Sequence, residues 1–223
     1  MYKRQVVEPP NEVRQDWWII QEIAKRMGLG WSYKSPKDIF DEMKLVMPSL
    51  DNISWERLKK DNHVTYPVKS ELIPGEDIIF TDGFPTSNNL AKIIPINLSK
   101  PNDELNSDFP LILSTGRLLE HWHTGTMTRR ALVLNELEPD PMIFMSQVDS
   151  NFYNLDLNKS VIIETRRGKI SIKIRHDDDL LPGMIFLPFC FKEAAANILT
   201  NSDLDPIGKI PELKFSAARV YQN

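Results

Sequence analysis

The sequence predicts a mostly β C-terminal half, folded as a small barrel or sandwich, which follows a helical and loop-rich N-terminal half. Short apolar runs of strand length recur after Phe109 and are separated by turn residues. Isoleucines alternate with polar residues over Lys169–Ile174, as in a strand with one wet face. Before residue 61, in contrast, apolar residues recur at helical spacing.

The composition limits what the chain can do by itself. With 27 basic and 31 acidic residues among 223, its net charge of −4 argues against nucleic acid as a main partner. The single cysteine, Cys190, excludes an internal disulfide and a thiolate zinc site or iron–sulfur cluster held by this chain alone. The sequence has no apolar run of about 18 residues that could span a membrane, and Met1–Pro10 lacks the apolar stretch of a signal peptide. A part of a larger redox enzyme is not excluded.

The first helix is expected over Trp17–Met27. Asp16 stands where the N-cap belongs, and Gly28 and Gly30 end the pattern. Apolar residues three and four positions apart form one face of this helix: Trp17, Ile20, Ile23, Ala24 and Met27.

A second helix begins at Pro36, with Ser35 as N-cap and Asp38 three residues after the cap. A short third helix is expected from Ser54 to about Lys60. The buried side of the second helix is predicted to consist of Ile39, Phe40, Met43 and Val46.

Residues 62–108 are rich in proline and predict irregular structure with few strands. Two short runs in it, Ile78–Phe80 and Lys92–Ile96, are β-like. The polar segment Leu98–Asp108 is the best domain boundary, which divides the chain into domains 1–108 and 109–223.

The second domain is predicted to contain six or seven strands. Arg166–Gly168 is expected to form a hairpin turn, and 177–179 another turn. An alanine-rich helical piece is expected over Lys192–Leu199. The predicted strands are Leu111–Ser114, Met142–Met145, Ser160–Thr165, Lys169–Ile174, Met184–Leu187 and Ala217–Tyr221.

The segment Ser114–Arg130 carries the densest chemistry in the sequence. It follows an apolar strand and combines two glycines and four threonines with histidine, arginine and tryptophan. Backbone N–H groups, hydroxyls and guanidinium groups of such a strand-to-loop turn suit an anion, and phosphate or pyrophosphate fits best. An ordinary polar loop is the alternative interpretation.

Two histidines in this segment flank a tryptophan. If the loop is extended, His121 and His123 point to one side and Trp122 to the other. Only Glu120 stands near them as a further ligand, so hydrogen bonding to a ligand or a buried neighbour is expected rather than metal binding. Glu120 itself is expected to be solvated or paired with arginine. Cys190, among apolar residues, is predicted to be a buried hydrophobe and no nucleophile.

A further segment, residues 189–214, places amide side chains after three consecutive alanines. Asn197, Thr200 and Asn201 can hydrogen-bond amide- or purine-like edges in both senses. For Thr200, Asn201 and Asp205, a role as caps and turn residues competes with this interpretation, and Asn197 is evenly balanced between the two.

At these segments the chain resembles a known family. TGRLLEHWHTGTMTRR at 115–130 is similar to the loop that opens the C-terminal domain of molybdopterin-dependent oxidoreductases of the dimethyl sulfoxide reductase superfamily. RRGKI at 166–170 and LPGMIFLPF at 181–189 resemble the same domain. Formate dehydrogenase catalytic subunits and nitrate reductases share the first motif, and residues 14–28, 35–43 and 191–214 are more similar to formate dehydrogenases. The resemblance begins near residue 12, and Met1–Gln5 lies outside it and is expected to be foreign to the native protein.

The resemblance implies a six-stranded double-psi β barrel, of the aspartate decarboxylase-like kind, over residues 109–223. It also implies that this barrel caps two molybdopterin guanine dinucleotides that hold molybdenum or tungsten. Residues 1–108 would be the end of the catalytic core. By match of position, the residues implied to bind or support the cofactor are Thr115, Gly116, Arg117, Leu118, Leu119, Glu120, His121, Trp122, Thr124, Thr126, Thr128, Asn197, Lys214 and Phe215.

The family's catalytic, metal-ligating and 4Fe-4S cluster residues have no match in this chain, which is therefore expected to be a C-terminal fragment. The whole enzyme would oxidise formate to CO2 and pass electrons through iron–sulfur, NAD-linked or ferredoxin-linked subunits or to a quinone pool. The upstream domains of the same subunit are the expected partners, with no nucleic acid and no membrane span. A cytoplasmic location is expected, with the periplasm as the alternative. A nitrate reductase and a non-enzymatic barrel module remain the rival interpretations.

Overall fold

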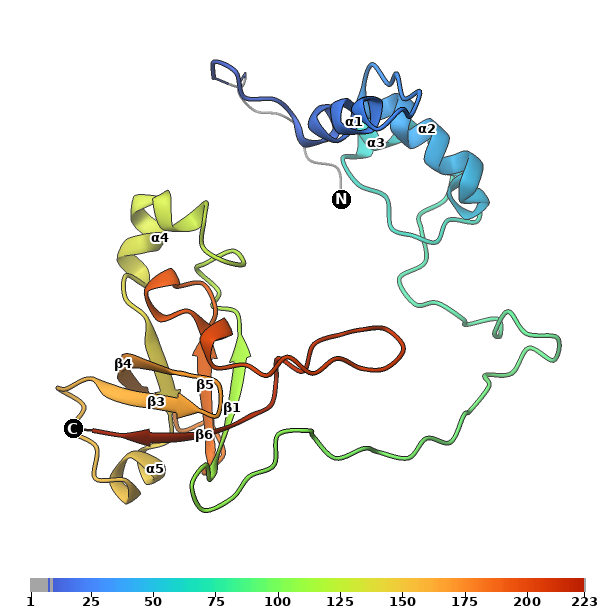
Figure 1. The fold of residues 1–223 in the computed structure, drawn as a ribbon. Coiled ribbons are helices and arrows are strands. Elements are labelled where there is room, and N and C mark those ends of the chain that lie inside the picture. Colours follow the sequence, from blue (N-terminus) through green and yellow to red (C-terminus); the bar gives the residue numbers. More distant parts are fainter. Residues whose placement is uncertain (1–7, 9, 223) are drawn as a thin grey trace. The chain divides into compact units, whose positions relative to one another are not determined.

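The computed structural model describes residues 8 and 10–222, and Met1–Gln5 lie outside the described residues. The chain divides into two compact units, Met1–Pro95 and Ile96–Asn223 (Figure 1). The division into domains 1–108 and 109–223 stays a prediction. Asp103, from the predicted boundary segment, is buried and ion-paired with Arg166 and Arg167 of the second unit.

The three predicted helices of the first unit are confirmed. They are α1 (Asp16–Arg26), α2 (Pro36–Val46) and α3 (Trp55–Asp61), and a 3-10 turn, η1 (Pro48–Leu50), follows α2. The prediction of Asp16 as N-cap is wrong because Gln15 has the extended backbone of the cap. Asp16 instead lies in the first turn, where its negative charge interacts favourably with the positive end of the helix dipole.

Side chains fix the starts of α2 and α3. The carboxylate of Asp38 accepts hydrogen bonds from the amides of Lys34, at 2.7 Å, and Ser35, at 3.1 Å. At α3, the Ser54 hydroxyl accepts from the Arg57 amide at 3.1 Å. The bond at α3 satisfies an N–H group that the first turn of a helix leaves without a partner, and the bonds at α2 hold the two residues that precede the helix.

The predicted buried side of α2 is not buried. Ile39 and Phe40 are half-buried, and the Phe40 ring contacts Trp55 at 5.8 Å between centroids. Met43 and Val46 are exposed, Val46 by 75%. The physical reason is that Trp55 of α3 packs against Phe40 near the start of the apolar face, and the end of that face, at Met43 and Val46, stays exposed.

The rest of the first unit is irregular, as predicted, but its two β-like runs are not strands. Phe80 has a φ of +62°, in the left-handed region that an extended strand does not use. Ile93 is 90% exposed, and no described residue pairs with the 92–96 run. The strand prediction from apolar composition was therefore wrong, because a strand also needs a second strand to which its backbone can hydrogen-bond.

We expect limited proteolysis to cut residues 62–95 before it cuts the barrel. This stretch has no helix or strand and exposes large apolar side chains such as Leu72 and Ile93, so local opening requires little free energy. Mass spectrometry of the early fragments locates the cuts. Equal resistance of the two units would contradict the expectation.

The second unit is a closed six-stranded barrel with the strand order β1-β5-β2-β4-β3-β6 (Figure 1). The pairs β1·β5 and β2·β4 are parallel, and the four other pairs are antiparallel. This is the predicted double-psi β barrel. Its strands are β1 (Leu111–Gly116), β2 (Met142–Met145), β3 (Val161–Thr165), β4 (Lys169–His176), β5 (Met184–Pro188) and β6 (Ser216–Tyr221).

Alternation along the strands forms the barrel core. In β4, the side chains of Ile170, Ile172 and Ile174 are buried, and the residues between them are exposed, as predicted. Each fully buried aliphatic side chain of this kind contributes about 1.5–3 kcal/mol. Further core side chains are Leu111, Leu113, Ile143, Met145, Val161, Ile163, Ile185, Leu187 and Leu199.

The predicted helical piece over Lys192–Leu199 is wrong as a single helix. It consists of two 3-10 turns, η3 (Lys192–Ala194) and η4 (Ala196–Ile198), with Ala195 extended between them. Burial of Ala194, Ala196 and Leu199 in the barrel sets this path and overrides the helical preference of alanine. Three short elements of the second unit were also not predicted: η2 (Thr128–Arg130), α4 (Leu132–Leu137) and α5 (Gln147–Phe152).

Candidate functional site

The predicted anion-binding segment, Ser114–Arg130, begins inside β1 and continues into the loop that follows this strand. Gly116 lies against the ring of Phe186 so closely that a Cβ would stand 2.4 Å from its Cε2 atom. The Gly116 carbonyl accepts a hydrogen bond from the Phe189 amide at 3.1 Å. The start of the loop is therefore anchored to the end of β5, and only glycine fits there without a shift.

Residues from the end of the domain meet this strand end. The Thr115 hydroxyl donates to the Leu213 carbonyl at 2.7 Å, and the Lys214 ammonium donates to the Thr115 carbonyl. The side-chain nitrogen Nδ2 of Asn201 donates to the Phe215 carbonyl at 3.3 Å. The structure thus brings together Thr115, Gly116, Lys214 and Phe215, which the sequence placed in one site.

His121 is buried and holds the loop from inside. Its Nε2 lies 2.7 Å from the Glu138 carbonyl, which can only accept, so this nitrogen carries the proton. Its Nδ1 lies 3.2 Å from the Thr128 hydroxyl, and that hydroxyl also accepts from the Trp122 amide at 3.0 Å. Both ring nitrogens are therefore hydrogen-bonded to groups of the protein, and the two partner residues, Thr128 and Glu138, are half-buried.

The predicted facing of the two histidines is wrong. His123 has a φ of +48°, so the segment is not extended at this point. His121 is buried while His123 is exposed, and the His123 ring contacts Trp122 at 4.6 Å between centroids. Among residues 8 and 10–222, no three His, Cys, Asp or Glu side chains are grouped as metal ligands.

Several predicted site residues present their side chains to solvent. Arg117 and Asn197 are exposed, and neither side chain has a hydrogen bond or ion pair within the described part of the chain. Leu119 is 97% exposed, and Trp122 is also exposed. The hydroxyls of Thr124 and Thr126 lie 3.0 Å apart.

Glu120 and Leu118, which alternate with exposed Arg117 and Leu119, are half-buried. The charge of Glu120 acts on Arg175, whose guanidinium binds both carboxylate oxygens of Glu138 at 2.7 and 2.9 Å. The hydrogen bonds to Glu138 and the charge of Glu120 raise the pKa of Arg175. Glu120 forms no ion pair with arginine among the described residues, so the expectation that it is solvated or paired with arginine stays a prediction.

Arg129 organises the loop, and sequence reasoning did not single it out. Its guanidinium pairs with Glu193 at 2.7 Å and lies over the Phe191 ring at 5.0 Å. Its buried Nε has no hydrogen-bond partner in the described structure. The sequence showed only that Arg129 is one of the arginines of this segment. Its ion pair could not be predicted from spacing, because Glu193 is 64 residues away.

Cys190 and two polar residues of the third segment have structural roles. Cys190 is buried, and desolvation raises the pKa of its thiol, which confirms the buried-hydrophobe interpretation. Asn201 is buried and also donates to Glu212 at 2.9 Å. The Asp205 carboxylate accepts from the amides of Ile210, Gly208 and Ile207, and these bonds lower its pKa. Asn201 and Asp205 are therefore turn residues.

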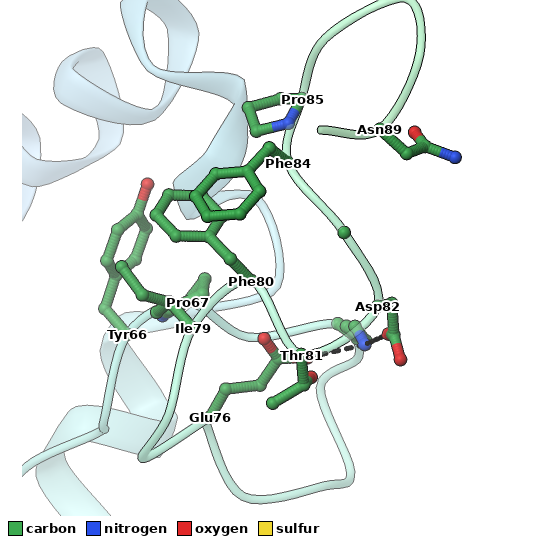
Figure 2. Close-up of a pocket in the computed structure, with 12 residues that line it drawn as sticks. Tyr66, Pro67, Glu76, Ile79, Phe80, Thr81, Asp82, Phe84, Pro85 and Asn89 are labelled. Atoms are coloured by element: carbon green, nitrogen blue, oxygen red, sulfur yellow. Dashed lines mark hydrogen bonds and ion pairs between the residues drawn. The ribbon is translucent and has the colours of Figure 1, made fainter. Parts of the chain in front are cut away.

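A separate cavity of about 480 Å³ lies in the first unit and is lined by residues between Tyr66 and Asn89 (Figure 2). The rings of Phe80 and Phe84 stack at 5.0 Å on one side of it. On the other side, Lys69 binds Glu76 at 2.6 Å and Asp82 at 2.8 Å, and these bonds raise its pKa. None of the predicted site residues lines this cavity.

Comparison with known proteins gives the barrel a family. Residues 111–217 match the family described as "Molydopterin dinucleotide binding domain". The second unit is a molybdopterin dinucleotide-binding domain. The chain is 38% identical over 219 residues to the F420-dependent formate dehydrogenase subunit alpha of Methanocaldococcus jannaschii, which covers 97% of this chain and 32% of that protein. These matches place the chain in the dimethyl sulfoxide reductase superfamily.

Two other matches show the range of related proteins. The chain is 29% identical to the assimilatory nitrate reductase catalytic subunit of Bacillus subtilis, over 95% of this chain and 31% of that protein. The acetylene hydratase from Pelobacter acetylenicus shares the fold, with a TM-score of 0.69 at 21% identity, over 99% of this chain and 34% of that one. The chain thus spans about a third of the length of each of these three relatives. No helix in residues 8 and 10–222 is long and apolar enough to cross a membrane.

Proposed function

We propose that this chain is the cofactor-binding C-terminal segment of the catalytic subunit of a formate dehydrogenase. The observation that carries the proposal is the molybdopterin dinucleotide-binding domain in a chain that is 38% identical to a formate dehydrogenase alpha subunit. The whole enzyme oxidises formate to CO2. When bound, two molybdopterin guanine dinucleotides supply the molybdenum or tungsten centre that accepts the electrons.

The donor set on the barrel fits such a cofactor. The Arg117 guanidinium is exposed and has no protein partner among the described residues, and its planar fork suits pyrophosphate. The Asn197 carboxamide is equally exposed and can donate and accept toward a guanine or pterin edge. The Lys214 ammonium lies at the end of β1, beside the Thr115 carbonyl.

We assign the predicted site residues two kinds of role. Arg117, Asn197, Lys214 and the exposed loop threonines contact the cofactor. Buried His121 and its half-buried partner Thr128 hold the loop in shape. The protein thus binds and orients the group that supplies the redox chemistry. The complete list of residues in the proposed site is Thr115, Gly116, Arg117, Leu118, Leu119, Glu120, His121, Trp122, Thr124, Thr126, Thr128, Asn197, Lys214 and Phe215.

The proposal extends to the parts that a whole enzyme needs. Upstream domains of the same subunit hold the metal ligand and a 4Fe-4S cluster, and electron-transfer subunits receive the electrons in the cytoplasm. The name of the Methanocaldococcus jannaschii relative makes F420 an acceptor to test, beside NAD and ferredoxin.

A nitrate reductase is the second candidate, because the Bacillus subtilis relative aligns over nearly the same share of this chain. Purified enzyme containing this chain distinguishes the two. We expect it to reduce a viologen dye with formate, and not to oxidise reduced dye with nitrate. The opposite result favours nitrate reductase. Stable protein without pterin and without either activity favours a non-enzymatic module.

We expect Arg117→Ala to lower the pterin content of the purified enzyme roughly tenfold, because a charge-assisted hydrogen bond to phosphate is lost. Fluorescence of the oxidised pterin, measured per mole of protein, gives the occupancy. Arg130→Ala is the matched control, since Arg130 is an exposed arginine at the far end of the same segment. Unchanged pterin content in Arg117→Ala would remove Arg117 from the site.

A further inference from the structure

We propose that Arg167 is a positioning residue that fixes the turn bearing Asn197. The inference rests on the proposed function, because it takes Asn197 to contact the cofactor. Arg167 belongs to the hairpin turn between β3 and β4. It reaches the turn through one backbone carbonyl, that of Leu199.

The Leu199 carbonyl receives hydrogen bonds from two side chains of the hairpin. The Thr165 hydroxyl donates to it at 2.9 Å. The Arg167 guanidinium donates through Nη2 at 3.0 Å and through Nε at 3.3 Å. A donor of fixed fork geometry sets the direction of a carbonyl more strictly than a flexible ammonium does. Leu199 lies two residues after Asn197.

The backbone of the hairpin also fits tightly against this turn. A Cβ on Gly168 would stand 2.7 Å from Cγ2 of Ile198 and 3.0 Å from the Ile198 carbonyl oxygen. Within the turn, the Leu199 amide donates to the Ala196 carbonyl at 2.9 Å. Contacts from the hairpin and within the turn therefore define the backbone on the C-terminal side of Asn197.

Asp103 in turn orients Arg167. Its carboxylate is buried, binds Nη1 of Arg167 at 2.7 Å, and accepts from the Ala217 amide at 2.8 Å. Arg167 therefore links Asp103, which precedes the barrel strands, to the Leu199 carbonyl. Asn197 lies at its end, between the buried side chains of Ala196 and Leu199, with its own carboxamide exposed.

Arg166 provides a matched comparison. It also binds the Asp103 carboxylate, but its Nη2 donates to the Glu104 carbonyl at 2.8 Å and its guanidinium lies over the Phe109 ring. No hydrogen bond from Arg166 to residues 196–201 is present in the described structure. Removing either arginine takes one cation from Asp103, but only the loss of Arg167 removes hydrogen bonds from the Leu199 carbonyl, which then keeps the Thr165 hydroxyl alone.

Hydrogen exchange measured by mass spectrometry on this chain tests the inference without any cofactor. We expect Arg167→Met to accelerate exchange in residues 197–201 about tenfold and Arg166→Met to leave that peptide unchanged. Arg167→Lys, which keeps the charge and loses the fork, should give an intermediate rate. Equal acceleration by both methionine variants, or by neither, would overturn the inference.

Pterin content of the purified enzyme links the turn to the cofactor. We expect Arg167→Met to lower it about fivefold and Arg166→Met to leave it unchanged. The double variant Arg167→Met/Asn197→Ala should be no worse than the worse single variant, because both act through one contact. Additive losses would overturn the inference. A wild-type enzyme that holds the pterin but does not oxidise formate would overturn the proposed function alone, since the exchange result does not depend on the substrate.

Discussion

Gly125→Ala is expected to destabilise the second unit by about 3 kcal/mol and to collapse the loop that precedes η2. Gly125 has a φ of +71°, and a Cβ there would stand 2.8 Å from the Cys190 carbonyl and 2.9 Å from the Arg129 side chain. The methyl group would therefore separate Arg129 from Phe191 and Glu193. Thermal unfolding followed by circular dichroism measures the loss.

Gly183→Ala is the matched control for this change. Gly183 has a φ of +86°, but a Cβ there would meet no atom within 4 Å. Only the left-handed backbone is penalised, by about 1 kcal/mol. Equal losses in the two variants would show that the contacts of Gly125 with Cys190 and Arg129 are unimportant.

Asp103→Asn is expected to destabilise the second unit by about 3 kcal/mol, because it leaves two arginines beside a neutral group. Asp103 is 6% exposed, and it joins Arg166, Arg167 and the Ala217 amide. Urea unfolding of the variant and the wild type gives the difference. Asp179→Asn, which changes an exposed aspartate, should shift stability by less than about 0.5 kcal/mol.

This difference should depend on pH in a stated direction. Burial acts to raise the pKa of Asp103, but hydrogen bonds from Arg167, the Ala217 amide and Arg166 outweigh it and hold the pKa below its ordinary value. The stabilisation is therefore complete above the ordinary value, about pH 4, and is lost as the pH falls through the lowered pKa. A wild-type advantage that stays constant from pH 7 to about pH 2 would contradict this account.

Local patterns predicted most of the fold. The alternation in β4 and the turn at Gly168 are visible over a few residues, and the structure reproduces both. The single helix over 192–199 was wrong because burial of Ala194, Ala196 and Leu199 in the barrel sets the path. The common facing of His121 and His123 was wrong because a left-handed residue breaks the assumed extended backbone.

The long-range contacts of the site had no local signal. Lys214 and Thr115 are 99 residues apart, and family resemblance alone placed them in one site. Asp103 lies 63 residues from Arg166 and 114 from Ala217, so its place in the barrel could not be inferred from spacing. Asp103 lies in the polar segment Leu98–Asp108, for which the sequence predicted only a domain boundary.

The nucleotide content of the enzyme tests most directly whether this barrel holds a molybdopterin guanine dinucleotide. Purified enzyme containing this chain should release guanosine monophosphate on acid hydrolysis, together with an oxidised pterin, in amounts stoichiometric with molybdenum or tungsten. Folded enzyme that carries the metal but releases neither guanosine monophosphate nor pterin would contradict the claim.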